Sequence, residues 1–191
     1  MAQQIDEDIK LACEAMKRGG VILYPTDTVW GIGCDATCSE AVKRVFEIKQ
    51  RSDHKALIVL LGDVGLLSQY VDDVPEIAYD LIDVAVKPLT IVYDQAVGLA
   101  PELLGADGSV GIRVTTEEFS RKLCRAYRRP IVSTSANVSG AVTPSMFSQI
   151  SDEIKQKMDY IVQSRRNDAE PHAPSSVIKL GKDGTVKIIR S

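Results

Sequence analysis

The sequence predicts one α/β domain, in which a mixed β-sheet carries helices on its faces. Apolar runs of strand length alternate with segments of helical periodicity through most of the chain. The last third carries several strand-like runs, which favours a mixed sheet over a purely parallel one. With 191 residues, 45% of them apolar, and no linker or low-complexity segment, we expect residues 1–191 to form a single domain.

The individual elements follow from the same two periodicities. Strands are expected over residues 21–24, 56–61, 89–93, 109–114, 130–137, 160–163, 176–180 and 186–190. Helices are expected over residues 5–16, 39–51, 75–84, 116–129 and 145–158. The run "ALIVLL" (56–61) is apolar throughout, so this strand should be covered on both faces.

Local signals predict where three of the helices begin or end. Gly19 and Gly20 should stop the first helix, and Ser39 should cap the second through its hydroxyl. Thr115 and Glu118 have the spacing of a capping box at the start of the fourth helix.

Composition restricts the classes of protein to consider. The net charge of −3 gives no overall attraction to nucleic acid or anionic membranes, so a polyanion site needs a local cluster of Lys and Arg. The four cysteines include no CxxC pair and have no zinc-site spacing from either histidine, which favours reduced thiols over a structural zinc. No signal peptide is evident, and no apolar run approaches the ~20 residues of a membrane span. We expect a cytoplasmic protein without a resident metal or membrane association.

Three polar segments predict a ligand pocket. "PTDT" follows the first strand, "STSAN" ends the strand at 130–137, and the basic cluster "KQRSDHK" precedes the strand at 56–61. Hydroxyl groups both donate and accept, and Lys49, Arg51 and Lys55 supply positive charge, so the set suits a small ligand with a phosphate or carboxylate. Taken singly, "PTDT" is typical of a turn and the basic cluster of a solvated helix end. "STSANVSG" has more side-chain hydrogen-bonding groups than one turn requires.

Other motifs support different chemistry less well. "GIGCDA" lacks the third glycine of a dinucleotide-binding loop and the lysine of a P-loop. The serines do not form GxSxG, and the two histidines lie in polar loops, so a hydrolase triad is not supported. Tyr127 beside Arg125, Arg128 and Arg129 could clamp nucleic acid, although a basic helix end is the commoner explanation.

Five segments, in order, resemble the YrdC/TsaC family of threonylcarbamoyl-AMP synthases over nearly the whole chain. They are "YPTDTVWGIG", "KQRSDHKALIVLL", "SVGIRV", "STSANVSG" and the late "PSSVIKL" with "IIR". The pairing of Lys49-x-Arg51 with Ser135-x-Asn137 is the family's signature. The resemblance implies a twisted sheet with a large basic cavity, in which L-threonine, bicarbonate and ATP give threonylcarbamoyl-AMP and pyrophosphate. It also implies Mg²⁺ with the ATP, and a functional link to the transferase complex that modifies tRNA.

The same resemblance implies roles for particular side chains. Lys49 and Arg51 would form the catalytic basic pair. The threonine contacts would be Thr28, Arg113, Ser133 and Ser175. The ATP contacts would be Arg51, Lys55, Ser109, Ser135, Asn137, Thr143 and Arg190. No residue is nominated as general base: Asp27 is near Thr28 in sequence, but a role in fixing the loop is the alternative.

Some features depart from the family pattern and leave alternatives open. Leu60 stands where some relatives place a histidine, Lys87 where a glycine is common, and the loop at 164–176 lacks paired glycines, so Ser175 competes with Ser176 for its role. One alternative is a related carbamoyl-adenylating enzyme with another acceptor. The other is a non-catalytic module that binds double-stranded RNA or tRNA through phosphates.

Overall fold

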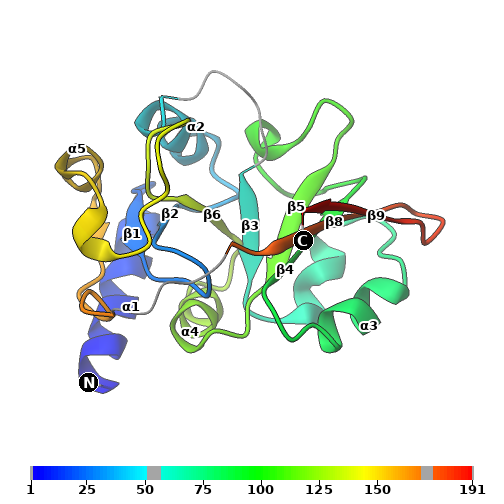
Figure 1. Ribbon diagram of the computed structural model, residues 1–191, viewed down its shortest axis with the longest axis horizontal. Helices are drawn as coiled ribbons and strands as arrows, with labels where there is room; N and C mark the ends of the chain where they lie inside the picture. The colour runs from blue at the N-terminus through cyan, green and yellow to red at the C-terminus, as the bar shows by residue number, and fades with distance from the viewer. Residues whose placement is uncertain (1, 51–56, 169–173, 191) are drawn as a thin grey trace.

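The computed structural model, which describes residues 2–50, 57–168 and 174–190, confirms a mixed α/β fold (Figure 1). The described strands are β1 (Ile22–Tyr24), β2 (Gly31–Gly33), β3 (Ile58–Leu61), β4 (Leu89–Tyr93), β5 (Val110–Val114), β6 (Ile131–Ser135), β7 (Tyr160–Ile161), β8 (Ser176–Leu180) and β9 (Val186–Arg190). The helices are α1 (Ala2–Lys17), α2 (Ser39–Ile48), α3 (Ile77–Asp83), α4 (Glu118–Tyr127) and α5 (Asp152–Gln156). Short 3₁₀ helices lie at η1 (Val64–Gln69), η2 (Pro101–Leu103) and η3 (Phe147–Gln149).

The described strands form one twisted sheet in the order β7-β1-β2-β6-β3-β5-β4-β8-β9. The pairs β1–β7, β3–β5 and β4–β8 are parallel, and the other neighbours are antiparallel, so the prediction of a mixed sheet is confirmed. Helices α1 and α4 pack against each other and contact β1, β7 and β3. Helix α2 contacts η2 and lies at the top of Figure 1, whereas α1 and α4 lie lower in the view.

Strand β2 was not among the predicted elements. It has only three residues, two of them glycine, so it carries almost no side-chain periodicity. A Cβ atom on Gly33 would lie 2.6 Å from the ring of Tyr24 and 2.8 Å from the carbonyl oxygen of Val132. Glycine therefore allows β2 to fit between β1 and β6, although glycine is unfavourable in most strands.

Two predicted helix caps were wrong. The N-cap of α2 is Cys38, and the hydroxyl of Ser39 donates to Glu102 instead of capping the helix. Helix α4 is capped by Glu117, whose carboxylate accepts from the amides of Phe119 and Ser120 and so replaces the predicted capping box.

The helix expected over 145–158 is divided into η3 and α5. The two are separated because Ile150 is extended and buried, and Ser151 caps α5 by accepting from the amide of Ile154. The burial of Ile150 in the core thus outweighs the helical spacing of the neighbouring residues.

A buried carboxylate joins α1 to the segment that follows β7. Asp8 is fully buried and accepts hydrogen bonds from the Tyr160 hydroxyl (2.6 Å), the Gln163 amide (2.9 Å), and the amide (2.8 Å) and hydroxyl of Ser164. Burial by itself would raise the pKa of Asp8, but these hydrogen bonds together lower it below its ordinary value. Asp8 is therefore a structural carboxylate that holds helix α1 against residues 160–164.

We expect Asp8→Asn to destabilise the protein by about 3 kcal/mol at pH 7, because an amide cannot accept all four bonds and places its own donors against them. The lowered pKa makes this stabilisation present above the unfolded-state value near pH 4 and lost as pH falls through the folded-state value. Urea unfolding at several pH values should therefore show the gap between wild type and variant closing below about pH 4. Asp6→Asn, at an exposed position of the same helix, should change nothing; an equal loss there would contradict the assignment.

Candidate functional site

A cavity of about 410 Å³ lies against the sheet, within the size range of small-molecule sites. Its described lining residues are Thr26, Thr28, Val29, Gly31, Ile58, Arg113, Ser133, Thr134, Ser135, Thr143, Ser145, Pro174, Ser175 and Arg190. Most of these side chains carry hydroxyls, and among the described lining the positive charge comes from two arginines. The described lining is thus rich in hydroxyls and includes two guanidinium groups.

The mixed sheet explains how residues far apart in sequence meet here. Ile58 of β3 lies opposite Ser133 of β6 in the antiparallel register, and Gly31 of β2 lies opposite Ser135. Because neighbouring strands run in opposite directions, the beginnings of β2 and β3 lie beside the end of β6. A Cβ atom on Gly31 would lie 3.3 Å from the Ser133 hydroxyl, so glycine keeps this part of the cavity open.

The structure brings all four predicted threonine contacts into this one cavity. Thr28, Arg113, Ser133 and Ser175 all line it, and each residue is at most 6% exposed. Polar side chains that converge on one cavity are typical of a site for a polar ligand. Ser176 begins β8 and is not among the described lining residues, which supports the assignment of Ser175 over Ser176.

A buried ion pair fixes the guanidinium group at the cavity. Arg113 Nη2 lies 3.0 Å from Asp27 Oδ1, and the two side chains are 3% and 12% exposed. Burial lowers the pKa of Arg113, and the negative charge of Asp27 opposes that shift. Arg113 Nε is buried and has no hydrogen-bond partner among the described residues. A carboxylate in the cavity would supply an acceptor for such a donor.

Ser175 is held by two side chains from different strands. Its hydroxyl lies 3.0 Å from that of Thr90, which is fully buried in β4. Arg190 donates to the Ser175 carbonyl through Nε (3.0 Å) and Nη2 (2.8 Å), and also to its hydroxyl (3.3 Å). Arg190 therefore lines the cavity with its guanidinium already bound to the protein.

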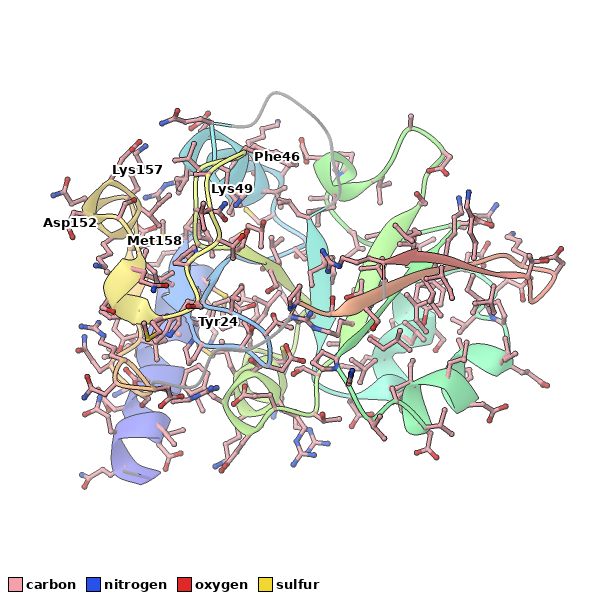
Figure 2. The ribbon with its side chains drawn as sticks, viewed as in Figure 1. Tyr24, Phe46, Lys49, Asp152, Lys157 and Met158 are labelled. Atoms are coloured by element: carbon pink, nitrogen blue, oxygen red, sulfur yellow. The ribbon has the colours of Figure 1, made fainter. Side chains whose placement is uncertain are left out.

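Lys49 supports the loop after β6. It is 2% exposed, and its Nζ donates to the carbonyls of Ser135 (2.6 Å) and Asn137 (2.8 Å). The amide of Ser139 in turn donates to the Lys49 carbonyl. Figure 2 shows Lys49 beside this loop, at the end of α2. A buried ammonium needs such acceptors, so the basic residue and the "STSAN" segment form one structural unit.

Asn137 also stabilises this loop. Its Oδ1 accepts from the Ser135 hydroxyl (2.5 Å), and its Nδ2 donates to the carbonyls of Val138 (3.1 Å) and Ala141 (2.7 Å). Ser135 lines the cavity, whereas neither Lys49 nor Asn137 is among its described lining residues. Lys49 and Asn137 thus stabilise the loop that follows Ser135, and of the described signature residues Ser135 is the one that lines the cavity.

The remaining predicted nucleotide contacts divide into three groups. Ser135, Thr143 and Arg190 line the cavity. Ser109 lies in the turn before β5, donates to Asp107, and is not among the described lining residues. Arg51 and Lys55 lie outside the described residues, so both assignments stay predictions.

Sequence reasoning missed several lining residues. Ser145 and Thr134 are hydroxyl residues in or near segments already singled out, and Thr26 belongs to the quoted "PTDT". The pattern of polar residues after a buried strand was therefore a usable signal for Thr26. Ile58 and Pro174 carry no such signal because their sequence neighbours do not indicate which way they face.

The arrangement at the end of α4 does not fit a nucleic-acid clamp. Tyr127 is buried, and its hydroxyl donates to Asp35 Oδ2 (2.7 Å), as Arg129 Nη1 also does (3.0 Å). The ring is thus unavailable for stacking on a base. Asp35 further accepts from the amide and hydroxyl of Thr37. The "GIGCDA" segment is thus linked through Asp35 to the end of α4.

Two features are absent from the described residues. Within the ranges described, no group of three or more His, Cys, Asp or Glu side chains could hold a metal ion. No helix in the described part of the chain is long and apolar enough to cross a membrane. The four cysteines are free thiols, and burial raises the pKa of Cys13, Cys34 and Cys124.

Two departures from the family pattern can be placed. Leu60 is fully buried, and in the parallel register of β3 and β5 it lies opposite Arg113. It therefore occupies a position next to the predicted carboxylate-binding residue. Lys87 is exposed just before β4 and is not part of the described cavity lining.

Relatives with curated names match much of this chain. A threonylcarbamoyl-AMP synthase of Hahella chejuensis is 39% identical over 130 residues, which cover 68% of this chain and 71% of the relative. One of Pseudoalteromonas translucida is 34% identical over 157 residues, 81% of this chain and 84% of the relative. These relatives are named as enzymes, which does not favour the non-catalytic RNA-binding alternative.

Solved structures show the same fold. P. abyssi Sua5, solved as a complex with L-threonine, aligns with a TM-score of 0.82 and 27% identity. The alignment covers 95% of this chain and 53% of that one, so the chain spans about half the length of that protein. E. coli YciO aligns with a TM-score of 0.82 and 27% identity over 96% of this chain and 88% of its own. The family model Sua5_yciO_yrdC, described as "Telomere recombination", matches residues 14–191. The chain belongs to the Sua5/YciO/YrdC family.

Proposed function

We propose that the chain is a threonylcarbamoyl-AMP synthase, which converts L-threonine, bicarbonate or CO₂, and ATP to threonylcarbamoyl-AMP and pyrophosphate. One observation carries this proposal: buried Arg113 and three buried hydroxyl residues line the same cavity. The names of the curated relatives and the threonine complex of P. abyssi Sua5 support it. The competing proposal is a related carbamoyl-adenylating enzyme with another acceptor. Leu60 stands where some relatives place a histidine, and it lies opposite Arg113 at the amino-acid end of the site.

The amino-acid end of the site is assigned from chemistry. A threonine carboxylate would be bound by the guanidinium of Arg113, whose Nε has no other partner among the described residues. The amine and hydroxyl of threonine need oxygen partners, which Thr28, Ser133 and Ser175 can supply. A valine side chain would leave a buried hydroxyl partner unsatisfied, so the site should discriminate against it.

The nucleotide end is assigned to Ser135, Thr143 and Arg190, with Arg51 and Lys55 joining them as predicted contacts. We place Mg²⁺ on the phosphates of ATP, with the phosphates and water as its main ligands, because the described lining offers hydroxyls and guanidinium groups and no carboxylate cage. We assign Lys49 to supporting the loop that carries Ser135.

The reaction then needs two steps. The neutral amine of threonine adds to CO₂ and loses a proton, giving a carbamate. A carbamate oxygen attacks the α-phosphorus of ATP, the bond to the β-phosphate oxygen breaks, and pyrophosphate leaves. Little covalent chemistry falls to the protein, so the rate should come from alignment and from cations that stabilise the phosphate charge.

We further propose a cytoplasmic role in tRNA modification, in which a transferase complex consumes the product. Direct binding of tRNA or double-stranded RNA is a separate hypothesis. A module that only binds RNA would lose affinity steeply with salt and would not need Ser133 or Ser135.

Pyrophosphate release from ATP, Mg²⁺ and bicarbonate tests the proposal. We expect release to depend on L-threonine and to fall at least about tenfold in catalytic efficiency with L-valine, because the lost hydroxyl leaves a polar partner unpaired. Equal rates with both amino acids would contradict the threonine assignment. No amino-acid dependence, with RNA bound by the folded protein, would contradict the catalytic proposal.

A further inference from the structure

Thr26 is 2% exposed and its hydroxyl makes three hydrogen bonds. Thr26 Oγ1 lies 2.6 Å from the carbonyl oxygen of Val29, 3.1 Å from the amide nitrogen of Thr28 and 3.1 Å from Thr28 Oγ1. A hydroxyl has one hydrogen to donate and two lone pairs that accept. These three contacts therefore use its complete capacity.

The identity of each donor follows from the partners. A carbonyl oxygen can only accept, so Thr26 must donate its one hydrogen to Val29. The Thr28 amide can only donate, so it occupies one Thr26 lone pair. In the contact between the two hydroxyls, Thr28 must then be the donor and Thr26 the acceptor.

This polarity decides what Thr28 can offer a ligand. Its only hydrogen points to Thr26, so the oxygen that lines the cavity presents lone pairs alone. Such an oxygen matches a ligand N–H and has nothing to donate to a carboxylate. Arg113, which offers only donors, lines the same cavity and suits the opposite end of an amino acid.

We infer that Thr26 is a positioning residue that fixes the Thr28 hydroxyl as an acceptor, and that Thr28 takes an N–H of the substrate's amino group. This inference rests on the proposed function and adds to it an orientation of the amino acid in the cavity. An ammonium, a neutral amine and a carbamate all keep an N–H, so one acceptor serves the substrate before and after the carbamate forms.

A comparison of ligands with and without the amino group separates the proposed role of Thr26 from a merely structural one. Affinity is measured for L-threonine and for (3R)-3-hydroxybutanoate, which has hydrogen in place of the amino group, by calorimetry with wild type, Thr26→Val and Thr28→Val. We expect the ratio of the two affinities to fall by about tenfold in Thr28→Val, since a hydrogen bond to a charged group is lost. In Thr26→Val the ratio should fall by less, because the Thr28 oxygen stays and only its fixed direction is lost. Thr26→Ser keeps the hydroxyl and should keep the wild-type ratio.

The double variant Thr26→Val/Thr28→Val should lower the ratio no further than Thr28→Val alone, because both changes act on one contact. A Thr26→Val ratio equal to wild type, with a lowered Thr28→Val ratio, would overturn the role of Thr26. An unchanged Thr28→Val ratio would overturn the amine contact, even if Thr26→Val failed to fold. If wild type binds no threonine, the proposed function fails first, which is a distinguishable result.

Discussion

Arg113→Gln is expected to lower threonine-dependent pyrophosphate release by at least about a hundredfold, the largest effect on activity that we predict. The change removes the cationic group that would bind the threonine carboxylate. It also leaves the buried carboxylate of Asp27 without the cation that lies 3.0 Å away. Breaking a buried ion pair from one side costs about 3–5 kcal/mol, so stability should fall as well. Steady-state kinetics and urea unfolding on the same preparation measure both effects.

A paired variant separates binding from folding. Arg113→Gln/Asp27→Asn removes both charges, so it should recover most of the lost stability while remaining inactive. Recovery of threonine-dependent activity in this double variant would contradict the role of Arg113 in binding the carboxylate. Full activity in the single variant would do so more directly.

Lys49→Met is expected to lower stability by about 3 kcal/mol and to weaken ATP use by at least about tenfold. The loss of stability follows because the carbonyls of Ser135 and Asn137 both lose the Nζ that donates to them. ATP use should weaken because that loop carries Ser135 into the cavity. Urea unfolding and the dependence of pyrophosphate release on ATP concentration are the measurements.

A matched control lies within helix α2, which ends just before Lys49. Lys43 pairs with Glu102 at 3.3 Å and has a side chain that is 58% exposed, so Lys43→Met should cost less than about 1 kcal/mol and leave the kinetics unchanged. If Lys49→Met were as mild as this control, the account of Lys49 as the support of the loop would be wrong.

The sequence was most informative where polar residues interrupt an apolar pattern. "PTDT" and "STSAN" predicted a hydroxyl-lined site, and the cavity contains Thr28, Ser133 and Ser135 from these segments. The periodicities also predicted the mixed sheet, since long runs such as 89–93 and 176–180 formed strands. Strand β2 escaped because its glycines fit against Tyr24, which is a tertiary effect.

Side-chain direction could not be predicted in the same way. Lys49 belongs to a basic cluster, yet its Nζ donates to backbone carbonyls of a loop distant in sequence. The ion pair of Arg113 with Asp27 likewise depends on how β5 packs beside the loop after β1. The division of the predicted helix at 145–158 depends on the burial of Ile150, which local propensity does not contain.

Mass analysis of the nucleotide product, formed from ATP, L-threonine and carbon-13 bicarbonate with Mg²⁺, tests the proposed reaction most directly. The proposal predicts a product with the mass of threonylcarbamoyl-AMP that carries the labelled carbon, in an amount equal to the pyrophosphate released. AMP without the labelled threonylcarbamoyl group, or no nucleotide product beyond that of an Arg113→Gln sample, would contradict it.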